Sequence, residues 1–175
     1  MNEIMKMGWV LRAIPDFPNY YVNDIGEVWS TMKSTRNPKG KQYQLKPNTN
    51  HKGYLFVILY RNKKRYPRLV ARLIVDAPKN ILVDHWNRIK TDNKVTNLRL
   101  CTHSQSAFNR KNSTNSESKF KGVHFDKKID KWRATITKEG YRQHLGYFDD
   151  ESEAAKVYNK KAIELHGEFA CLNVI

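Results

Sequence analysis

The residues best suited to chemistry stand together near the middle of the chain. Asp84 directly precedes His85, and Asp92, Asn93 and Asn97 follow at short intervals. A carboxylate can hold a hard divalent cation, and a histidine can accept a proton from water at neutral pH. A cation and a base acting together can hydrolyse a phosphodiester. The spacing therefore predicts a metal-assisted nuclease site.

A bare Asp-His pair has a simpler interpretation, because most such pairs are a solvated acid beside a surface histidine. The amide side chain of Asn97 at a fixed distance downstream, together with the segment that precedes the pair, favours the functional interpretation instead.

The charge of the chain indicates a polyanionic partner. The 175 residues include 32 Lys and Arg against 17 Asp and Glu, a formal net charge of +15. Residues 28–75 contain no acidic residue at all. A single basic cluster is often only a solvated face, but an acid-free stretch of this length favours nucleic acid, to which such a charge gives affinity.

Other features narrow the class of protein. No apolar run approaches the roughly 18 residues of a membrane span, and residues 1–10 lack the apolar core of a signal peptide. We expect a soluble intracellular protein, in the cytoplasm of a bacterial host if it is phage-encoded. Cys101 and Cys171 lack CxxC spacing, so any metal should be a hard ion bound by oxygen.

The N-terminal half is predicted to be rich in β structure. Residues 20–29 fit two short strands around a turn that contains Gly26, and residues 53–70 fit a hairpin. The basic tip of that hairpin is expected to contact DNA phosphates through Arg61, Lys63, Lys64, Arg65 and Arg68.

The candidate site lies in a predicted ββα unit. Residues 81–83 form a strand that delivers Asp84 and His85, and residues 86–97 form a polar loop and a second strand. Residues 102–112 form a helix with Thr102 or Ser104 as its N-cap.

Two stretches resemble known nuclease motifs. Trp9 and residues 14–17 and 21–28 look like the nuclease-associated module that often precedes the HNH motif in phage and intron homing endonucleases. Residues 84–85, 87, 92–93, 97–99 and 102–105 resemble the HNH motif itself, a ββα-metal fold. Together the two resemblances span residues 9–112.

The HNH resemblance implies a role for each matching residue. Asp84 would bind one divalent cation, Mg2+ or Mn2+, and His85 would act as general base. Asn97 would orient that base, and Arg72 matches an arginine of the preceding segment. Three positions depart from the family pattern: Ser106 replaces an Asn metal ligand, Ala71 replaces a His, and Arg88 replaces a Gly.

A second module is predicted after a linker at residues 111–119. Three strands at residues 120–125, 131–137 and 141–148 precede a helix that starts after Asp150 and ends at Gly167. Alternation puts Trp132, Ala134 and Ile136 on one face of the sheet and Arg133, Thr135 and Thr137 on the other.

This module resembles the plant ethylene-response-factor DNA-binding domain, which is also found fused to HNH nucleases. The resemblance rests on residues 121–123, 131–133, 145–148, 153–155, 158 and 167–173. It implies that the sheet lies in the major groove of DNA, although it transfers no base preference. The matching DNA-contact candidates are Lys121, His124, Trp132, Arg133, Thr135, Thr137, Arg142 and His144.

The sequence thus predicts an α+β protein with three parts. Residues 1–110 form a β-rich module with a ββα-metal nuclease core, residues 111–119 a linker, and residues 120–175 a three-stranded antiparallel sheet packed on one helix. We expect a monomeric, site-selective DNA endonuclease that acts on double-stranded DNA with one metal ion per active site and no small-molecule cofactor.

Two alternatives remain open from the sequence. A catalytically degenerate DNA-binding protein or regulator is favoured by Ser106 and Ala71 and opposed by Asp84, His85 and Asn97. A structural RNA-binding protein would use the same charge, but the major groove of A-form RNA is too narrow for a sheet.

Overall fold

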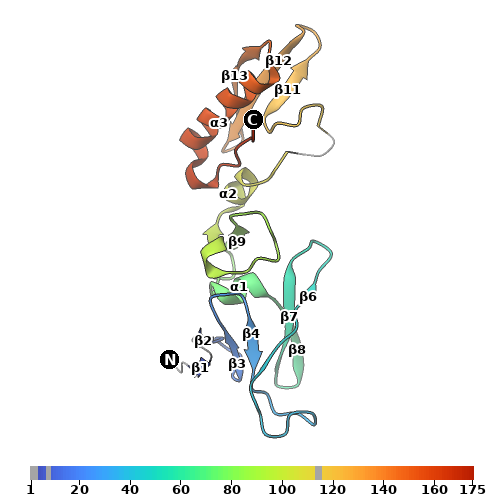
Figure 1. The fold of residues 1–175 in the computed structure, drawn as a ribbon, viewed down its shortest axis with the longest axis vertical. Coiled ribbons are helices and arrows are strands. Elements are labelled where there is room, and N and C mark those ends of the chain that lie inside the picture. The colour runs from blue at the N-terminus through green and yellow to red at the C-terminus, as the bar shows by residue number, and fades with distance from the viewer. Residues whose placement is uncertain (1–3, 7–8, 113–115) are drawn as a thin grey trace. The chain divides into compact units, whose positions relative to one another are not determined.

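A computed structural model describes residues 4–6, 9–112 and 116–175 (Figure 1). The chain divides into two compact units, Met1–Cys101 and Thr102–Ile175. All strand pairs are antiparallel and helices are few, so the predicted α+β class is confirmed. Among the described residues no helix combines the length and the apolar character needed to cross a membrane.

The first unit begins with a five-stranded sheet in sequence order. The predicted pair of short strands around Gly26 is confirmed, because β3 and β4 pair with Tyr21 opposite Trp29 and Gly26 has a φ of 94°. The five strands are β1 (Ile4–Lys6), β2 (Trp9–Ala13), β3 (Tyr20–Val22), β4 (Val28–Ser30) and β5 (Tyr43–Gln44).

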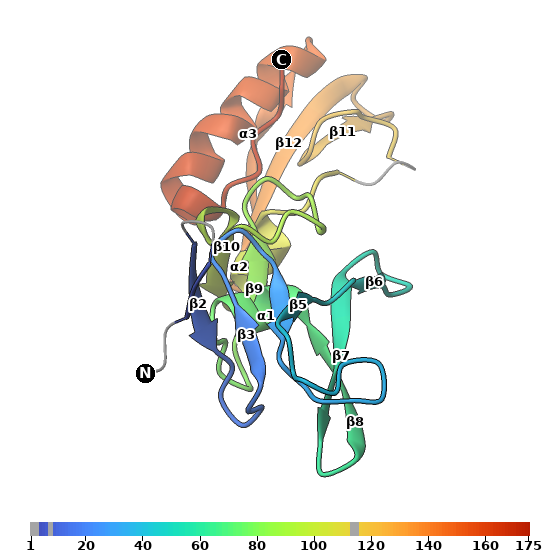
Figure 2. The same cartoon turned by 60° about the horizontal axis from the view of Figure 1, so that its bottom comes forward.

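A second sheet contains the predicted hairpin. It consists of β6 (Asn48–Thr49), β7 (Leu55–Arg61) and β8 (Lys64–Leu69), and Figure 2 shows β7 and β8 as a long ribbon. Asn62 and Lys63 have φ values of 51° and 60° and form the two-residue turn. The tip is therefore shorter than expected, because Arg61 and Lys64 already belong to the paired strands.

One core joins the N-terminal module to the predicted ββα unit. Helix α1 (Val70–Ile74) packs in this core. Ala71, which departs from the family pattern, is 5% exposed there, and Leu98, from the predicted ββα unit, is 9% exposed. The other buried members are Ile14, Phe17, Tyr20, Val22, Val28, Val57, Leu59, Val70 and Ile74.

The predicted ββα elements all form, with shifted bounds. Strand β9 (Leu82–His85) contains both Asp84 and His85, and it pairs with β10 (Leu98–Cys101). The prediction that the second strand falls within residues 86–97 was wrong, because that segment is a loop followed by the 3-10 helix η1 (Val95–Asn97).

Helix α2 (His103–Phe108) is shorter than the predicted 102–112 and belongs to the second unit. Thr102 is its N-cap, and the side chains of Thr102 and Gln105 complete a capping box. The helix ends early because Lys121 Nζ donates to the carbonyl oxygens of Phe108 and Arg110, at 2.5 and 2.7 Å. A cation that satisfies the last carbonyls favours termination there.

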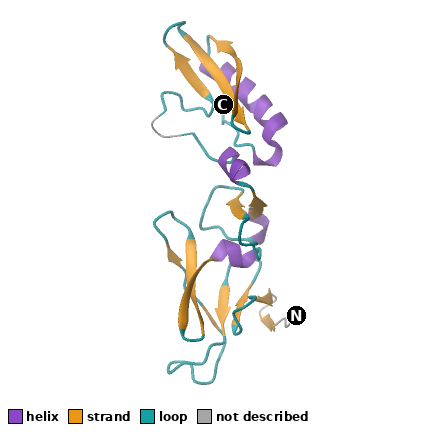
Figure 3. Ribbon diagram, turned by 180° about the vertical axis from the view of Figure 1, so that it is seen from behind, coloured by secondary structure: helices purple, strands orange, loops and turns teal. Residues whose placement is uncertain are grey.

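The second unit has the predicted three strands and helix. Strands β11 (Val123–Asp126), β12 (Lys131–Lys138) and β13 (Tyr141–Phe148) form a meander, and helix α3 (Glu151–His166) packs along it (Figure 3). Asp150 caps α3 by accepting from the Glu153 N–H, and Gly167, with a φ of 53°, ends it before η2 (Gly167–Phe169).

The predicted linker is only partly described, since residues 113–115 lie outside the described residues. The rest of it is not simply a spacer. Ser118 is 1% exposed, and its hydroxyl donates to Glu151 Oε1 at 2.7 Å. Ser118 therefore packs in the second unit, and the bounds of the linker stay a prediction.

Candidate active site and candidate DNA-binding face

Strand β9 places Asp84 and His85 side by side, supported by β10. Asp84 lies opposite Arg99 in the pairing, and His85 lies opposite Leu98. Successive residues of a strand point to opposite faces, so the two candidate side chains have separate surroundings. His85 is 4% exposed and the Asp84 side chain 11%.

Asp84 forms an ion pair with the residue opposite it. Arg99 donates to Asp84 Oδ2 through Nε at 3.0 Å and through Nη2 at 2.8 Å. The Arg99 guanidinium carbon also lies 5.2 Å from the ring centroid of Trp86, an exposed side chain in the next position after His85. Sequence spacing did not identify Arg99 as part of the site.

His85 is held by Asn93, in a buried contact. The distance from His85 Nε2 to Asn93 Oδ1 is 3.0 Å, and Asn93 is 5% exposed. An amide oxygen can only accept a hydrogen bond, so the tautomer that fits this contact has its N–H at Nε2. The Tyr54 ring lies 5.9 Å from the imidazole. This tautomer suits a general base.

Asn97 does not make the contact with His85 that the sequence predicted. Its Oδ1 accepts from the Asn87 N–H at 3.0 Å, and its Nδ2 donates to the Asp92 carbonyl oxygen at 2.8 Å. Asn97 thus closes the loop that carries Asn93. In this structure Asn93 contacts His85, and the orienting role expected of Asn97 stays a prediction.

The N-terminal module supports that loop. A Cβ on Gly26 would lie 3.0 Å from the Asn93 carbonyl carbon and oxygen. The Val95 N–H donates to the Asp24 carbonyl oxygen at 2.8 Å. The tight turn at Gly26 therefore packs against the segment that holds His85, a contact that the sequence spacing did not predict.

Arg72 contacts backbone rather than the candidate site. Its guanidinium donates to the carbonyl oxygens of Ile81, Ala77 and Pro78, at 2.6, 3.1 and 2.6 Å. These contacts fix the segment that leads into β9. Arg72 thus positions this segment, and the catalytic role given to it in the sequence analysis stays a prediction.

The donor set does not form a ready divalent-cation site. No group of three or more His, Cys, Asp or Glu side chains that could hold a metal is present among the described residues. The predicted second ligand, Ser106, lies on α2 in the second unit. Asp84, a suitable hard oxygen donor, is engaged with Arg99. As they stand, these residues fit a cation poorly.

The predicted basic hairpin has a structured aromatic base. Arg61 and Arg68 each stack on both Phe17 and Tyr66, with guanidinium-to-centroid distances of 5.3 to 5.4 Å. These stacks hold two cations on one side of the ribbon. The remaining predicted contacts, Lys63, Lys64 and Arg65, are exposed at its tip.

The strand register of the second unit brings most predicted DNA contacts to one face. His124 is opposite Arg133, and Arg133 is opposite Tyr147. Thr135 is opposite His144 and Thr137 is opposite Arg142. Thr135 is only 7% exposed. Tyr147 is 45% exposed in this row and was missed, although its position in the alternation beside Arg133 could have indicated it.

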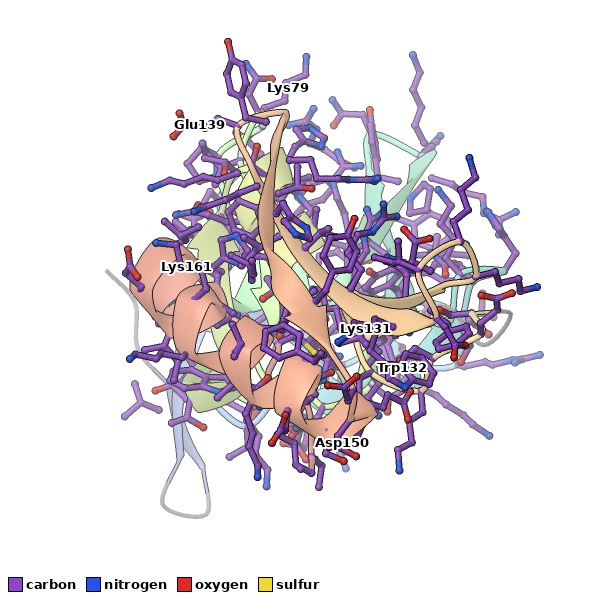
Figure 4. All side chains as sticks on the ribbon, turned by 90° about the horizontal axis from the view of Figure 1, so that it is seen from above. Lys79, Lys131, Trp132, Glu139, Asp150 and Lys161 are labelled. Atoms are coloured by element: carbon purple, nitrogen blue, oxygen red, sulfur yellow. The ribbon has the colours of Figure 1, made fainter. Side chains whose placement is uncertain are left out.

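Two predicted contacts have other roles. Trp132 shares the face of Ala134 and packs against the core, with its ring 5.0 Å from that of Phe125. Figure 4 labels Trp132 beside Lys131 on β12. Lys121 binds the end of α2. Core packing and carbonyl oxygens engage these two side chains, and their contact with DNA stays a prediction.

The electrostatic surroundings keep His124 neutral. Burial lowers the pKa of His124, and the nearby charges of Arg133 and Arg142 lower it further, while Glu117 opposes them. A neutral imidazole offers both a donor and an acceptor to a base edge. This state suits recognition of bases more than of phosphates.

Comparisons with known proteins define the class. The model of the HNH endonuclease family matches residues 76–107, which include Asp84, His85 and Asn93. The chain is 37% identical over 117 residues to an uncharacterized HNH endonuclease of Acanthamoeba polyphaga mimivirus, covering 65% of this chain and 59% of that protein. It is 31% identical over 111 residues to Protein 3.8 of Escherichia phage T7, covering 63% and 91% respectively.

A further relative is the H-N-H endonuclease F-TflII of Escherichia phage T5, 33% identical over 98 residues, or 52% of this chain and 47% of that protein. This chain belongs to the HNH endonuclease family, which confirms the resemblance seen in the motif. It spans about half the length of the two relatives named as endonucleases. The resemblance to the ethylene-response-factor domain stays a prediction.

A solved structure of DNA binding and cleavage by the HNH homing endonuclease I-HmuI aligns over 89% of this chain and 90% of that one. The identity is 20% and the TM-score 0.47. The family assignment rests on the sequence comparisons.

Proposed function

We propose that this protein is a site-selective DNA endonuclease of the homing type, with His85 as general base and Asp84 as the ligand of one divalent metal ion. HNH nucleases generally depend on a divalent metal, and the ion proposed here is Mg2+ or Mn2+. The observation that carries the proposal is the buried 3.0 Å contact between His85 Nε2 and Asn93 Oδ1. It fixes both the ring and its tautomer.

The chemistry of the chain's own residues is proton transfer with controlled geometry. In the proposed reaction, His85 Nδ1 takes a proton from water while the water oxygen forms a bond to phosphorus. One phosphorus–oxygen ester bond breaks at the same centre, and the departing oxygen takes a proton from solvent. Asn93 prevents rotation of the imidazole, so the entropic cost of orienting the base is already met before the reaction.

Two surfaces are proposed to bind double-stranded DNA. The basic hairpin of β7 and β8 would contact backbone phosphates through Arg61 and Arg68 and the lysines at its tip. The exposed row of His124, Arg133 and Tyr147 would contact base edges, as expected for a sheet of the ethylene-response-factor type in the major groove. The shared register of that row supports this assignment.

Cleavage of supercoiled plasmid tests the proposal. Because the target site is undefined, the substrate is a pool of plasmids with randomised inserts, incubated with Mg2+ or Mn2+. We expect nicked or linear product that EDTA abolishes and that His85→Ala reduces by at least about 100-fold. His51→Ala, an exposed histidine in a turn, is the matched control. Equal cutting by wild type and His85→Ala would refute the assignment.

A second candidate is the catalytically degenerate DNA-binding protein. The ion pair of Asp84 with Arg99 and the presence of Ser106 favour it. This candidate predicts tight binding to DNA from the same pool with no metal-dependent cleavage of any member.

A further inference from the structure

The carboxylate assigned to the metal already has a cationic partner. Asp84 and Arg99 are directly opposite in the β9–β10 pairing, and Arg99 uses both Nε and Nη2 to bind Asp84 Oδ2. Each side chain is 11% exposed. Salt and water screen a pair at this depth only weakly. The negative charge of Asp84 is therefore balanced within the fold.

The position of Arg99 is fixed by more than the ion pair. Its guanidinium carbon is 5.2 Å from the Trp86 ring centroid, and Trp86 is 55% exposed. The β10 backbone supplies a third restraint through the pairing of Arg99 with Asp84. Arg99 thus contacts a buried carboxylate and an exposed indole at once, beside the residue proposed as general base.

This arrangement conflicts with direct binding of a dication. A cation on Asp84 would lie near the Arg99 guanidinium, and like charges at close range repel. Within the described part of the chain no group of three or more His, Cys, Asp or Glu side chains that could hold a metal ion is present. The cation therefore requires either departure of Arg99 or negative charge from elsewhere.

We propose that Arg99 competes with the divalent cation for Asp84, and that a backbone phosphate of DNA removes this competition by accepting the guanidinium. The inference rests on the proposed nuclease function. A phosphate suits the role because its oxygens accept two parallel hydrogen bonds from a guanidinium. The free protein then binds the cation weakly, and DNA and cation each strengthen the binding of the other by the same factor.

Calorimetric titration of Mn2+ into the full chain measures the competition without relying on cleavage. We expect Arg99→Gln to bind Mn2+ at least about fivefold more tightly than wild type, the lower end of typical coupling between sites. Arg88→Gln, which removes the same charge from the neighbouring loop, should leave the affinity unchanged. Equal affinities for wild type and Arg99→Gln would overturn the proposal.

A DNA arm tests the role of phosphate. In a His85→Ala background, which prevents cutting, a short mixed-sequence duplex should raise Mn2+ affinity strongly. Adding Arg99→Gln to that background should reduce the increase, because the competitor is already gone. The same increase with and without Arg99 would show that phosphate does not act through this residue.

Asp84→Asn separates failure of this inference from failure of the proposed function. It should abolish Mn2+ binding with and without duplex. If wild type cleaves DNA with Mn2+ but Arg99→Gln changes no affinity, only the competition is wrong. If no form of the protein binds Mn2+ even with duplex, both proposals are wrong.

Arg99→Gln leaves the largely buried Asp84 carboxylate without its cationic partner, which could unfold the β9–β10 strand pair. A measurement on the unsubstituted protein covers that case. The Arg99 Nε–H signal in 15N nuclear magnetic resonance spectra, assigned with Arg99→Lys, should shift when Mg2+ saturates the duplex complex. A signal that stays in place at saturation would contradict release of Arg99.

Discussion

The two units of this protein position their functional side chains by different means. In the first unit, His85 is buried and Asp84 is partly buried, and each is held by a residue from a later segment, Arg99 or Asn93. In the second unit, His124, Arg133 and Tyr147 form a row that strand register alone aligns. The candidate catalytic groups are thus held by tertiary contacts, whereas the row on the sheet is aligned by strand pairing.

This difference predicts how substitutions act. Substitutions around the first site should act on His85 through the loop that carries Asn93. Substitutions on the exposed sheet face should have only local effects. Four experiments test the comparison, in order of decreasing effect.

Gly122→Ala should destabilise the second unit most. A Cβ at this position would lie 2.2 Å from Tyr158 Cδ2 and 2.6 Å from the Thr135 carbonyl oxygen, and the φ is 76°. Overpacking of this kind costs about 3 kcal/mol of the free energy of unfolding. Thermal unfolding checks it, with DNA binding expected to fall in parallel.

Gly140→Ala is the matched control in the same unit. Its φ is 84°, but nothing lies within 4 Å of the added Cβ. Only the backbone penalty of about 1 kcal/mol applies. If both variants lose the same stability, close packing at Gly122 is not what holds this unit together.

Asn93→Ala should damage catalysis at a distance from any DNA contact. It removes the acceptor for His85 Nε2, so the ring is free to rotate and the buried N–H loses its partner. We expect a fall in cleavage rate of about 100-fold with DNA binding retained. Single-turnover cleavage and a binding titration measure the two effects.

Asn93→Asp keeps an oxygen acceptor at the same place and should restore much of the rate. A variant pair that is equally inactive would point to a general structural role for Asn93 rather than orientation of His85.

Arg133→Ala should weaken DNA binding locally, by about 1–3 kcal/mol if its guanidinium contacts a base edge. Its nearest acid is Asp126, at 3.8 Å, so the guanidinium is not locked in a short ion pair. Lys161→Ala removes one charge from α3, which packs on the other face of the sheet, and should have little effect (Figure 4). Equal losses in a binding titration would indicate that net charge, not the row, determines affinity.

Acidification should destabilise the second unit gradually. Burial is the main cause that lowers the pKa of both His124 and His166 below the ordinary value of 6.5. Between the lowered values and 6.5 the unfolded chain binds more protons, so stability is complete above about 6.5 and falls as pH drops below it. Calorimetry from about pH 7.5 to 5.5 should show a slope that His166→Gln reduces; an unchanged slope would exclude His166 as a source.

Local sequence patterns determined many parts of this protein. The turn at Gly26, the cap at Asp150 and the alternation along residues 131–137 depend on near neighbours, so they were predictable. The adjacency of Asp84 and His85 was likewise visible, because a strand carries its residues in sequence order.

Only the tertiary structure decided which partner each functional group has. Asn93 and Asn97 are the same residue type four positions apart. Because the loop packs against Gly26, Asn93 contacts His85, whereas Asn97 accepts a hydrogen bond from the backbone of Asn87. Arg99 pairs with Asp84 because β10 returns antiparallel to β9. Sequence alone gives spacing along the chain, but a hydrogen bond depends on distance in space, and that distance follows from packing.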